Sequence, residues 1–107
     1  MKNEHGTILD SNGYAPSIMR GPEMLCALCY RGGDLVRHEI FHGSYRQKSK
    51  ALGLWITVCP ECHAEIHSTA YKDRLMKMDG QAMAMEHYGW NVAEFRRRFG
   101  KNYLEET

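Results

Sequence analysis

The chain is organised around one nonapeptide, Cys59-Pro60-Glu61-Cys62-His63-Ala64-Glu65-Ile66-His67. Its two cysteines are separated by two residues, and its two histidines are four residues apart. A second Cys-x-x-Cys pair, Cys26 and Cys29, precedes it by a gap of 29 residues. All four cysteines of the protein and four of its six histidines therefore fall between Cys26 and His67. We interpret the rest of the chain as support for this window.

The composition limits the classes of protein to which the chain can belong. Its 107 residues suit one small domain, whose limited core would be stabilised by a structural metal or a partner subunit. The 14 basic and 13 acidic side chains nearly balance, so the net charge gives no argument for nucleic acid, although one face can still be basic. No apolar run approaches the roughly 20 residues of a membrane helix, and the N-terminus lacks a signal-peptide pattern. We expect a cytoplasmic protein without a membrane partner, where paired cysteines bind metal or do redox work.

The first half of the chain predicts an arm and two strands. Residues 1–23 contain glycines and prolines without a sustained period, which predicts a flexible or irregular N-terminal arm. Residues 24–107 form the expected domain. Residues 35–41 and 54–58 are rich in apolar, β-branched and aromatic side chains, which predicts two antiparallel strands. We expect a polar loop over residues 43–53 between them.

The second half of the chain predicts three helices. A helix should begin at Pro60, where the missing N–H of proline costs nothing. A second helix is expected over residues 73–88, weakened by Gly80, and a third from Asn91 to a stop at Gly100. The order of strand, loop, strand and helices predicts a small α+β fold.

The four cysteines have the spacing of a tetrahedral zinc site. Two Cys-x-x-Cys pairs, Cys26 with Cys29 and Cys59 with Cys62, would supply four thiolates. A closed shell of four thiolates leaves no position for water, which favours a structural Zn²⁺. The alternatives are a pair of redox dithiols or unrelated buried cysteines.

A second metal site is predicted by the histidines. His63 and His67 would lie one turn apart on the same helix face, and the strand that carries His38 and Glu39 is expected beside that helix. These four residues are the candidate ligands of a catalytic divalent cation. The alternative is that the helical histidines are simply solvated.

This arrangement resembles the HNH (His-Me finger) endonucleases and their ββα-metal core. The resemblance rests on His38-Glu39-Ile40-Phe41-His42-Gly43-Ser44, on Gly53-Leu54-Trp55 and on the nonapeptide. It is strongest to a bacteriophage-type subgroup that also has a zinc knuckle of cysteine pairs and an ending like Phe99-Gly100-Lys101-Asn102-Tyr103. It covers about residues 26–103.

The resemblance implies a metal-dependent DNA endonuclease that hydrolyses phosphodiester bonds, by nicking or double-strand cutting, with low sequence specificity. It implies a phage-encoded protein in the host cytoplasm, working with other phage packaging or recombination proteins. A double-strand break by one site per chain would favour a homodimer. The implied cofactors are structural Zn²⁺ and a catalytic Mg²⁺, Mn²⁺, Ni²⁺ or Zn²⁺.

The roles within the doublet are left open by the sequence. The family implies that one of His38 and Glu39 is a metal ligand and the other is the general base. With the order kept, His38 is the ligand and Glu39 the base. We favour the swapped assignment, because a carboxylate is a weak base near neutral pH and a hard oxygen ligand. The middle asparagine of the family motif is missing, and His42 is a spare candidate that we expect to face solvent.

Three basic residues of the expected loop, Arg46, Lys48 and Lys50, alternate with polar residues. In a nuclease core they would bind the substrate backbone, with the planar Arg46 fork gripping the scissile phosphate. The alternative is a solvated charge run.

The sequence leaves two rival functions open. A non-catalytic zinc-stabilised nucleic-acid-binding module would explain Glu39 as a sign of lost hydrolysis. A protein-binding zinc module would leave His38, His63 and His67 without a shared purpose. The discriminating feature is whether these three histidines converge on one cation.

Overall fold

The computed structural model describes residues 1–104, so residues 105–107 of the predicted domain lie outside the described part. The elements in chain order are β1 (Val36–Glu39), the 3-10 helix η1 (Gly43–Tyr45), α1 (Arg46–Ala51), β2 (Trp55–Val58), α2 (Pro60–Ser68), α3 (Ala70–Tyr88) and α4 (Val92–Phe99). The strands pair antiparallel, with His38 opposite Ile56 and Glu39 opposite Trp55. The expected α+β fold is confirmed.

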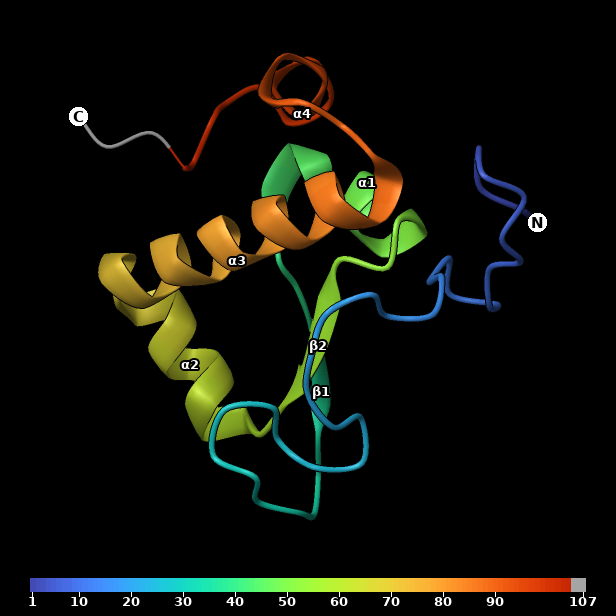
Figure 1. The fold of residues 1–107 in the computed structure, drawn as a ribbon. Coiled ribbons are helices and arrows are strands. Elements are labelled where there is room, and N and C mark those ends of the chain that lie inside the picture. Colours follow the sequence, from blue (N-terminus) through green and yellow to red (C-terminus); the bar gives the residue numbers. More distant parts are fainter. Residues whose placement is uncertain (105–107) are drawn as a thin grey trace.

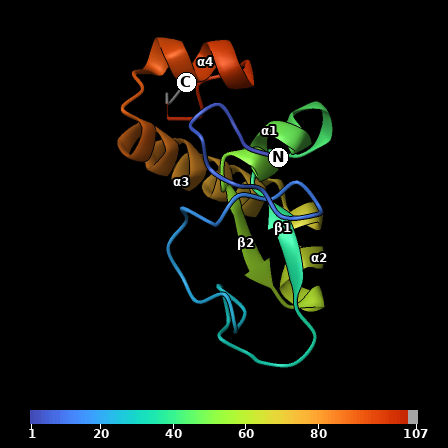
Figure 2. The same cartoon turned by 90° about the vertical axis from the view of Figure 1, so that its right-hand side faces the viewer.

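The helices surround a central hairpin. Figure 1 shows α2 beside β1 and β2, α3 crossing the upper end of the hairpin, and α4 above α3. The turned view in Figure 2 again places α2 along the hairpin and α4 on the far side of α3. No helix within residues 1–104 is both long enough and apolar enough to span a membrane.

The core lies where the end of β1 meets α3 and α4. Phe41 is buried, and its ring centroid lies 4.6 Å from that of Phe99 and 5.4 Å from that of Phe95. Gly80 faces this core from the middle of α3, and a Cβ there would lie 2.5 Å from the Cγ2 atom of Ile40. A glycine weakens a helix by about 1 kcal/mol, but here it allows α3 to approach the hairpin closely.

The prediction of a polar loop over residues 43–53 was wrong, because this segment forms η1 and α1. Most residues of α1 are good helix formers, but no apolar period marks the segment. The buried hydroxyl of Ser49 fixes the helix instead: it donates to the Leu54 carbonyl at 2.6 Å and accepts from the Phe41 N–H at 3.1 Å. Tertiary contacts therefore stabilise a helix that is too short to be stable by itself.

The ends of the other helices follow the expected signals closely. α3 begins at Ala70, three residues before the expected position. It ends at Gly89, whose φ of 71° is left-handed. The side chain of Asn91 accepts from the Glu94 N–H at 2.8 Å and caps α4, and Gly100 ends that helix with a φ of 78°.

The N-terminal arm is irregular but well anchored. Apart from an isolated bridge between Lys2 and Ile8, residues 1–23 contain no strand or helix. The Ala15 carbonyl accepts a hydrogen bond from the Trp55 indole at 2.7 Å, and Tyr14 is buried against the hairpin. The arm therefore packs on the domain and brings side chains to its surface.

Candidate metal centres

The four cysteines form one cluster between the loop before β1 and the start of α2. The Sγ atoms of Cys26, Cys29, Cys59 and Cys62 all lie within 4.8 Å of one another. The Sγ atoms of Cys29 and Cys59 are 3.8 Å apart. Tetrahedral zinc with Zn–S bonds of about 2.3 Å requires S–S distances of about 3.8 Å. The donor set and the spacing both fit Zn²⁺, so this is a candidate structural zinc site, as the sequence predicts.

Backbone N–H groups point at the buried sulfurs. The N–H of Cys29 donates to Cys26 Sγ at 3.5 Å, and that of Cys62 donates to Cys59 Sγ at 3.4 Å. Burial raises the pKa of the Cys26 thiol, but N–H groups led by that of Cys59 outweigh it and lower this pKa to about 6. Burial and the neighbouring sulfurs raise the pKa of Cys62. A divalent cation would relieve this competition for negative charge among the thiols.

Three histidines form a second cluster, which we call the histidine cluster: His38 on β1, with His63 and His67 on α2. One ring nitrogen from each lies within 4.8 Å of the other two. The Nε2 atoms of His63 and His67 are 3.1 Å apart. Two imidazoles on one cation, each with a metal–nitrogen bond of about 2.1 Å, have nitrogens about 3.0–3.4 Å apart. The geometry therefore fits a shared cation.

His38 is the buried member of this cluster. Its side chain is 1% exposed, and its Nε2 atom is buried without a hydrogen-bond partner among the described residues. Burial, followed by the charges of His63, His67 and His42, lowers the pKa of His38 to about 4. Burial likewise lowers the pKa of His63. Neutral imidazole is the form that binds metal, so at neutral pH these rings are ready to do so.

The carboxylate of Glu39 is engaged elsewhere. Glu39 lines the same hollow as His38, but it is not among the residues whose ligand atoms converge with His38. It accepts a hydrogen bond from the Tyr14 hydroxyl at 2.8 Å and one from the Arg46 Nε atom. Burial raises the pKa of Glu39, but these hydrogen bonds outweigh burial and lower it. The arrangement favours His38 as the ligand and gives no support to the swapped assignment.

His42 lies closer to the site than we expected. Its Nε2 atom is 2.9 Å from Asp73 Oδ1, and its ring centroid lies 5.4 Å from that of His67. Its side chain is 37% exposed. His42 follows His38 by four residues, and this spacing does not by itself predict that His42 lies near the histidine cluster. The contact with Asp73 of α3 holds His42 beside the cluster.

The basic side chains of Arg46, Lys48 and Lys50 lie on two different faces of α1. In a helix, Arg46 and Lys50 share a face, whereas Lys48 points away from them. Accordingly, Lys48 donates from Nζ to the Arg98 carbonyl at 2.9 Å on another side of the molecule. The surface around the histidine cluster is hollowed into what we call the histidine cleft. It is lined by Asn12, Tyr14, Val36, Arg37, His38, Glu39, His42, Arg46, Lys50, His63 and His67.

Comparisons with known proteins give no independent assignment: no family model, no curated protein and no solved structure matches this chain. The assignment of the site therefore depends on the positions of its own residues. The structure shows a hairpin followed by a helix, a four-cysteine cluster, and three histidines that could hold a cation.

Proposed function

We propose that the chain is a metal-dependent endonuclease that hydrolyses phosphodiester bonds of DNA at the histidine cleft. The observation that carries this proposal is the buried, unpartnered Nε2 atom of His38 among the nitrogens of His63 and His67. A buried polar atom without a partner costs free energy. A divalent cation in the cluster would provide that partner and would face an open cleft.

The bound cation would supply electrostatic stabilisation of the charge that develops on the phosphate and the leaving oxygen. In this proposal Arg46 binds the same phosphate. Its side chain is 50% exposed. Within residues 1–104, its Nε atom donates a hydrogen bond to Glu39, and its two Nη atoms make none. Its two Nη atoms can therefore donate to phosphate oxygens, and the neighbouring Lys50 adds positive charge to the cleft.

In this proposal the doublet keeps the family order, with His38 as ligand and Glu39 as the residue beside the reacting phosphate. Glu39 holds Arg46 in place, and its carboxylate is the candidate proton acceptor. Because its pKa is lowered, it is ionised at neutral pH but is a weak base. We therefore expect slow hydrolysis compared with a site that has a histidine at this position.

A different observation, the pairing of Glu39 with Tyr14 and Arg46, favours a second candidate function, a zinc-stabilised nucleic-acid-binding module without hydrolysis. If the pairing of Glu39 with Tyr14 and Arg46 is purely structural, the cleft lacks a base. The basic side chains would then bind phosphates without cutting. The two functions differ in one measurable outcome, which is cation-dependent cleavage.

The test is nicking of supercoiled plasmid in Mg²⁺, Mn²⁺, Ni²⁺ or EDTA by zinc-loaded, folded protein. His63→Ala removes one ligand, and His87→Ala is the matched control, because His87 is exposed near the end of α3 and outside the cleft. We expect cation-dependent nicking by the natural protein and by His87→Ala, and its loss in His63→Ala. Binding of the plasmid without nicking in every cation would favour the binding module.

A further inference from the structure

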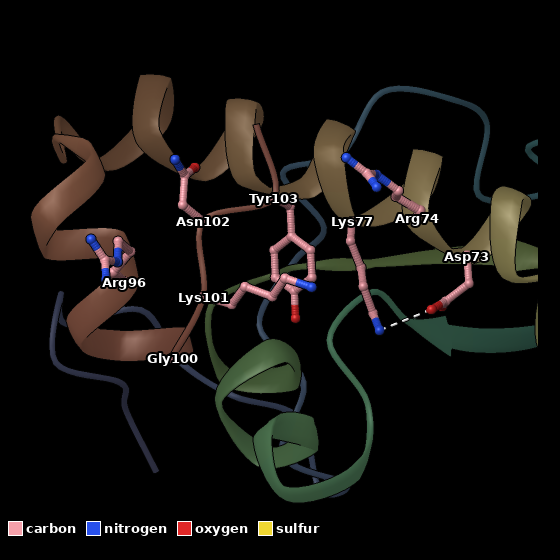
Figure 3. Close-up of a pocket in the computed structure, with 8 residues that line it drawn as sticks. All are labelled: Asp73, Arg74, Lys77, Arg96, Gly100, Lys101, Asn102 and Tyr103. Carbon is pink, nitrogen blue, oxygen red and sulfur yellow. Dashed lines mark ion pairs between the residues drawn. The ribbon is translucent and has the colours of Figure 1, made fainter. Parts of the chain in front are cut away.

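A second polar pocket lies between α3 and the segment after α4 (Figure 3), and none of its lining residues belongs to either metal cluster. We call it the basic pocket. Two of its basic side chains come from α3, one from α4 and one from the residue after Gly100. They are Arg74, Lys77, Arg96 and Lys101.

The charge in this pocket is largely uncompensated. Its one acidic side chain, Asp73, is paired with Lys77 at 2.9 Å, as Figure 3 shows. Within residues 1–104, Arg74, Arg96 and Lys101 take part in no ion pair. Three cations that have no acidic partner within the described residues 1–104 lie on one concave surface, and such a surface is suited to an anion.

The neighbouring arginines of α4 show that this is not a general property of the helix. Arg97 and Arg98 both pair with Glu94, and Arg98 also pairs with Glu4 of the arm. Arg96, on the side of the helix that faces the pocket, has no such partner. Of the three arginines of α4, the one that lines the basic pocket is therefore the one without an acidic partner within residues 1–104.

The wall of the pocket is held by a buried side chain. Gln81 is 0% exposed, and its amide donates to Asn102 Oδ1 while its carbonyl oxygen accepts from the Tyr103 N–H, both at 2.7 Å. A glutamine buried this completely and hydrogen-bonded at both ends fixes the segment in one position. The ammonium groups of Lys77 and Lys101 both lie over the Tyr103 ring, 5.6 Å and 5.4 Å from its centroid. The pocket is thus preformed.

Asp73 connects the basic pocket to the histidine cleft. One of its oxygens accepts from Lys77 inside the pocket, and the other is 2.9 Å from His42, which lines the cleft. The contact between Asp73 and His42 therefore links the two concave sites, and a strand bound in the cleft can continue past Asp73 into the pocket. Guanidinium groups such as those of Arg74 and Arg96 match the geometry of phosphate oxygens.

We propose that the basic pocket binds backbone phosphates of the nucleic acid beyond the phosphodiester that is cut in the histidine cleft. This inference rests on the proposed function, because the cleft defines where the strand lies. Phosphate contacts in the pocket increase the affinity for the nucleic acid and fix its position along the protein, but they do not recognise base sequence. Each phosphate contact releases counterions, so its loss is measurable as a change in salt dependence.

The test is the slope of log K against log[salt] for a duplex oligonucleotide, measured by fluorescence anisotropy with zinc-loaded protein and no added cation. Arg96→Gln/Lys101→Gln removes two cations of the pocket. Lys2→Gln/Arg97→Gln is the control, because it makes the same charge change at two exposed residues outside the pocket and the cleft. The pocket variant should lose about 1.8 from the magnitude of the slope, at about 0.9 for each phosphate contact. The control should keep the natural slope.

The inference is overturned if the slope is unchanged in the pocket variant or if the control loses as much of the slope. It is also overturned if the natural protein does not bind the oligonucleotide. Plasmid nicking by the natural protein is measured separately and decides the proposed function. Nicking with an unchanged slope refutes the pocket alone. A reduced slope without nicking supports the pocket and refutes the nuclease.

Discussion

The Tyr14 hydroxyl donates a hydrogen bond to Glu39 Oε2 across 2.8 Å, and both side chains are buried. Tyr14 belongs to the N-terminal arm, and Glu39 belongs to the doublet on β1. The arm therefore helps to form the histidine cleft and orients the carboxylate that holds Arg46. This relationship makes the arm part of the candidate site.

Tyr14→Phe should lower the free energy of unfolding by about 1–2 kcal/mol, because it removes a hydrogen bond to a buried carboxylate. It should also raise the pKa of Glu39, since one of the two hydrogen bonds that lower it is lost. Urea unfolding at neutral pH measures the first effect. Tyr71→Phe is the matched control, because Tyr71 is 69% exposed. Equal stability of both variants would contradict a role for the Tyr14 hydroxyl.

Glu39 should make the protein less stable in acid. Its folded pKa is lowered, so it lies below the unfolded value of about 4.3. Its stabilising contribution is therefore complete above the unfolded pKa and is lost as pH falls through the folded one. Urea unfolding as a function of pH should show a shallower acid loss in Glu39→Gln than in the natural protein. Identical acid profiles would show that the carboxylate is not stabilised by its partners.

Removal of zinc should unfold much of the domain. The four-cysteine cluster joins the loop before β1 to the start of α2, and structural zinc sites contribute on the order of 10 kcal/mol to folding. Metal analysis should find one zinc per chain, and Cys29→Ser should lower both zinc content and melting temperature. Added Zn²⁺ should restore the chelated natural protein. A natural protein that keeps its melting temperature after zinc removal would contradict the structural assignment.

Arg46 and Lys48 should differ sharply in their effect on nicking, although they are two residues apart. Arg46 lines the cleft, whereas Lys48 bonds to the Arg98 carbonyl on another face. Arg46→Lys keeps the charge but loses the fork, and should slow nicking by about 100-fold if it binds the reacting phosphate. Lys48→Gln should leave the nicking rate unchanged. The opposite ranking would place the substrate on the other face of α1.

The sequence predicts those parts of the site that depend on short spacings. The two Cys-x-x-Cys pairs and the spacing of His63 and His67 led directly to the two clusters. The sequence did not predict α1, because this helix has no apolar period and is stabilised by hydrogen bonds of the buried Ser49 hydroxyl. Because α1 was expected to be a loop, Lys48 was grouped with residues that lie on another face.

Contacts between distant segments could not be predicted in this way. Tyr14 lies 25 residues before Glu39, and His42 lies 31 residues before Asp73. Each contact depends on the packing of the whole chain, and no local pattern indicates it. The basic pocket has the same origin, because Gln81 brings the segment after α4 against α3.

The central claim is that His38, His63 and His67 bind one divalent cation, and calorimetric titration of the zinc-loaded protein with Mn²⁺ or Ni²⁺ tests it most directly. We expect one cation per chain beyond the zinc and unchanged binding in His87→Ala. Binding by His63→Ala should be weaker by 10-fold or more, because loss of a residue that only supports a ligand already weakens metal binding by about 10–100-fold. Equal binding by the natural protein and His63→Ala would contradict the claim.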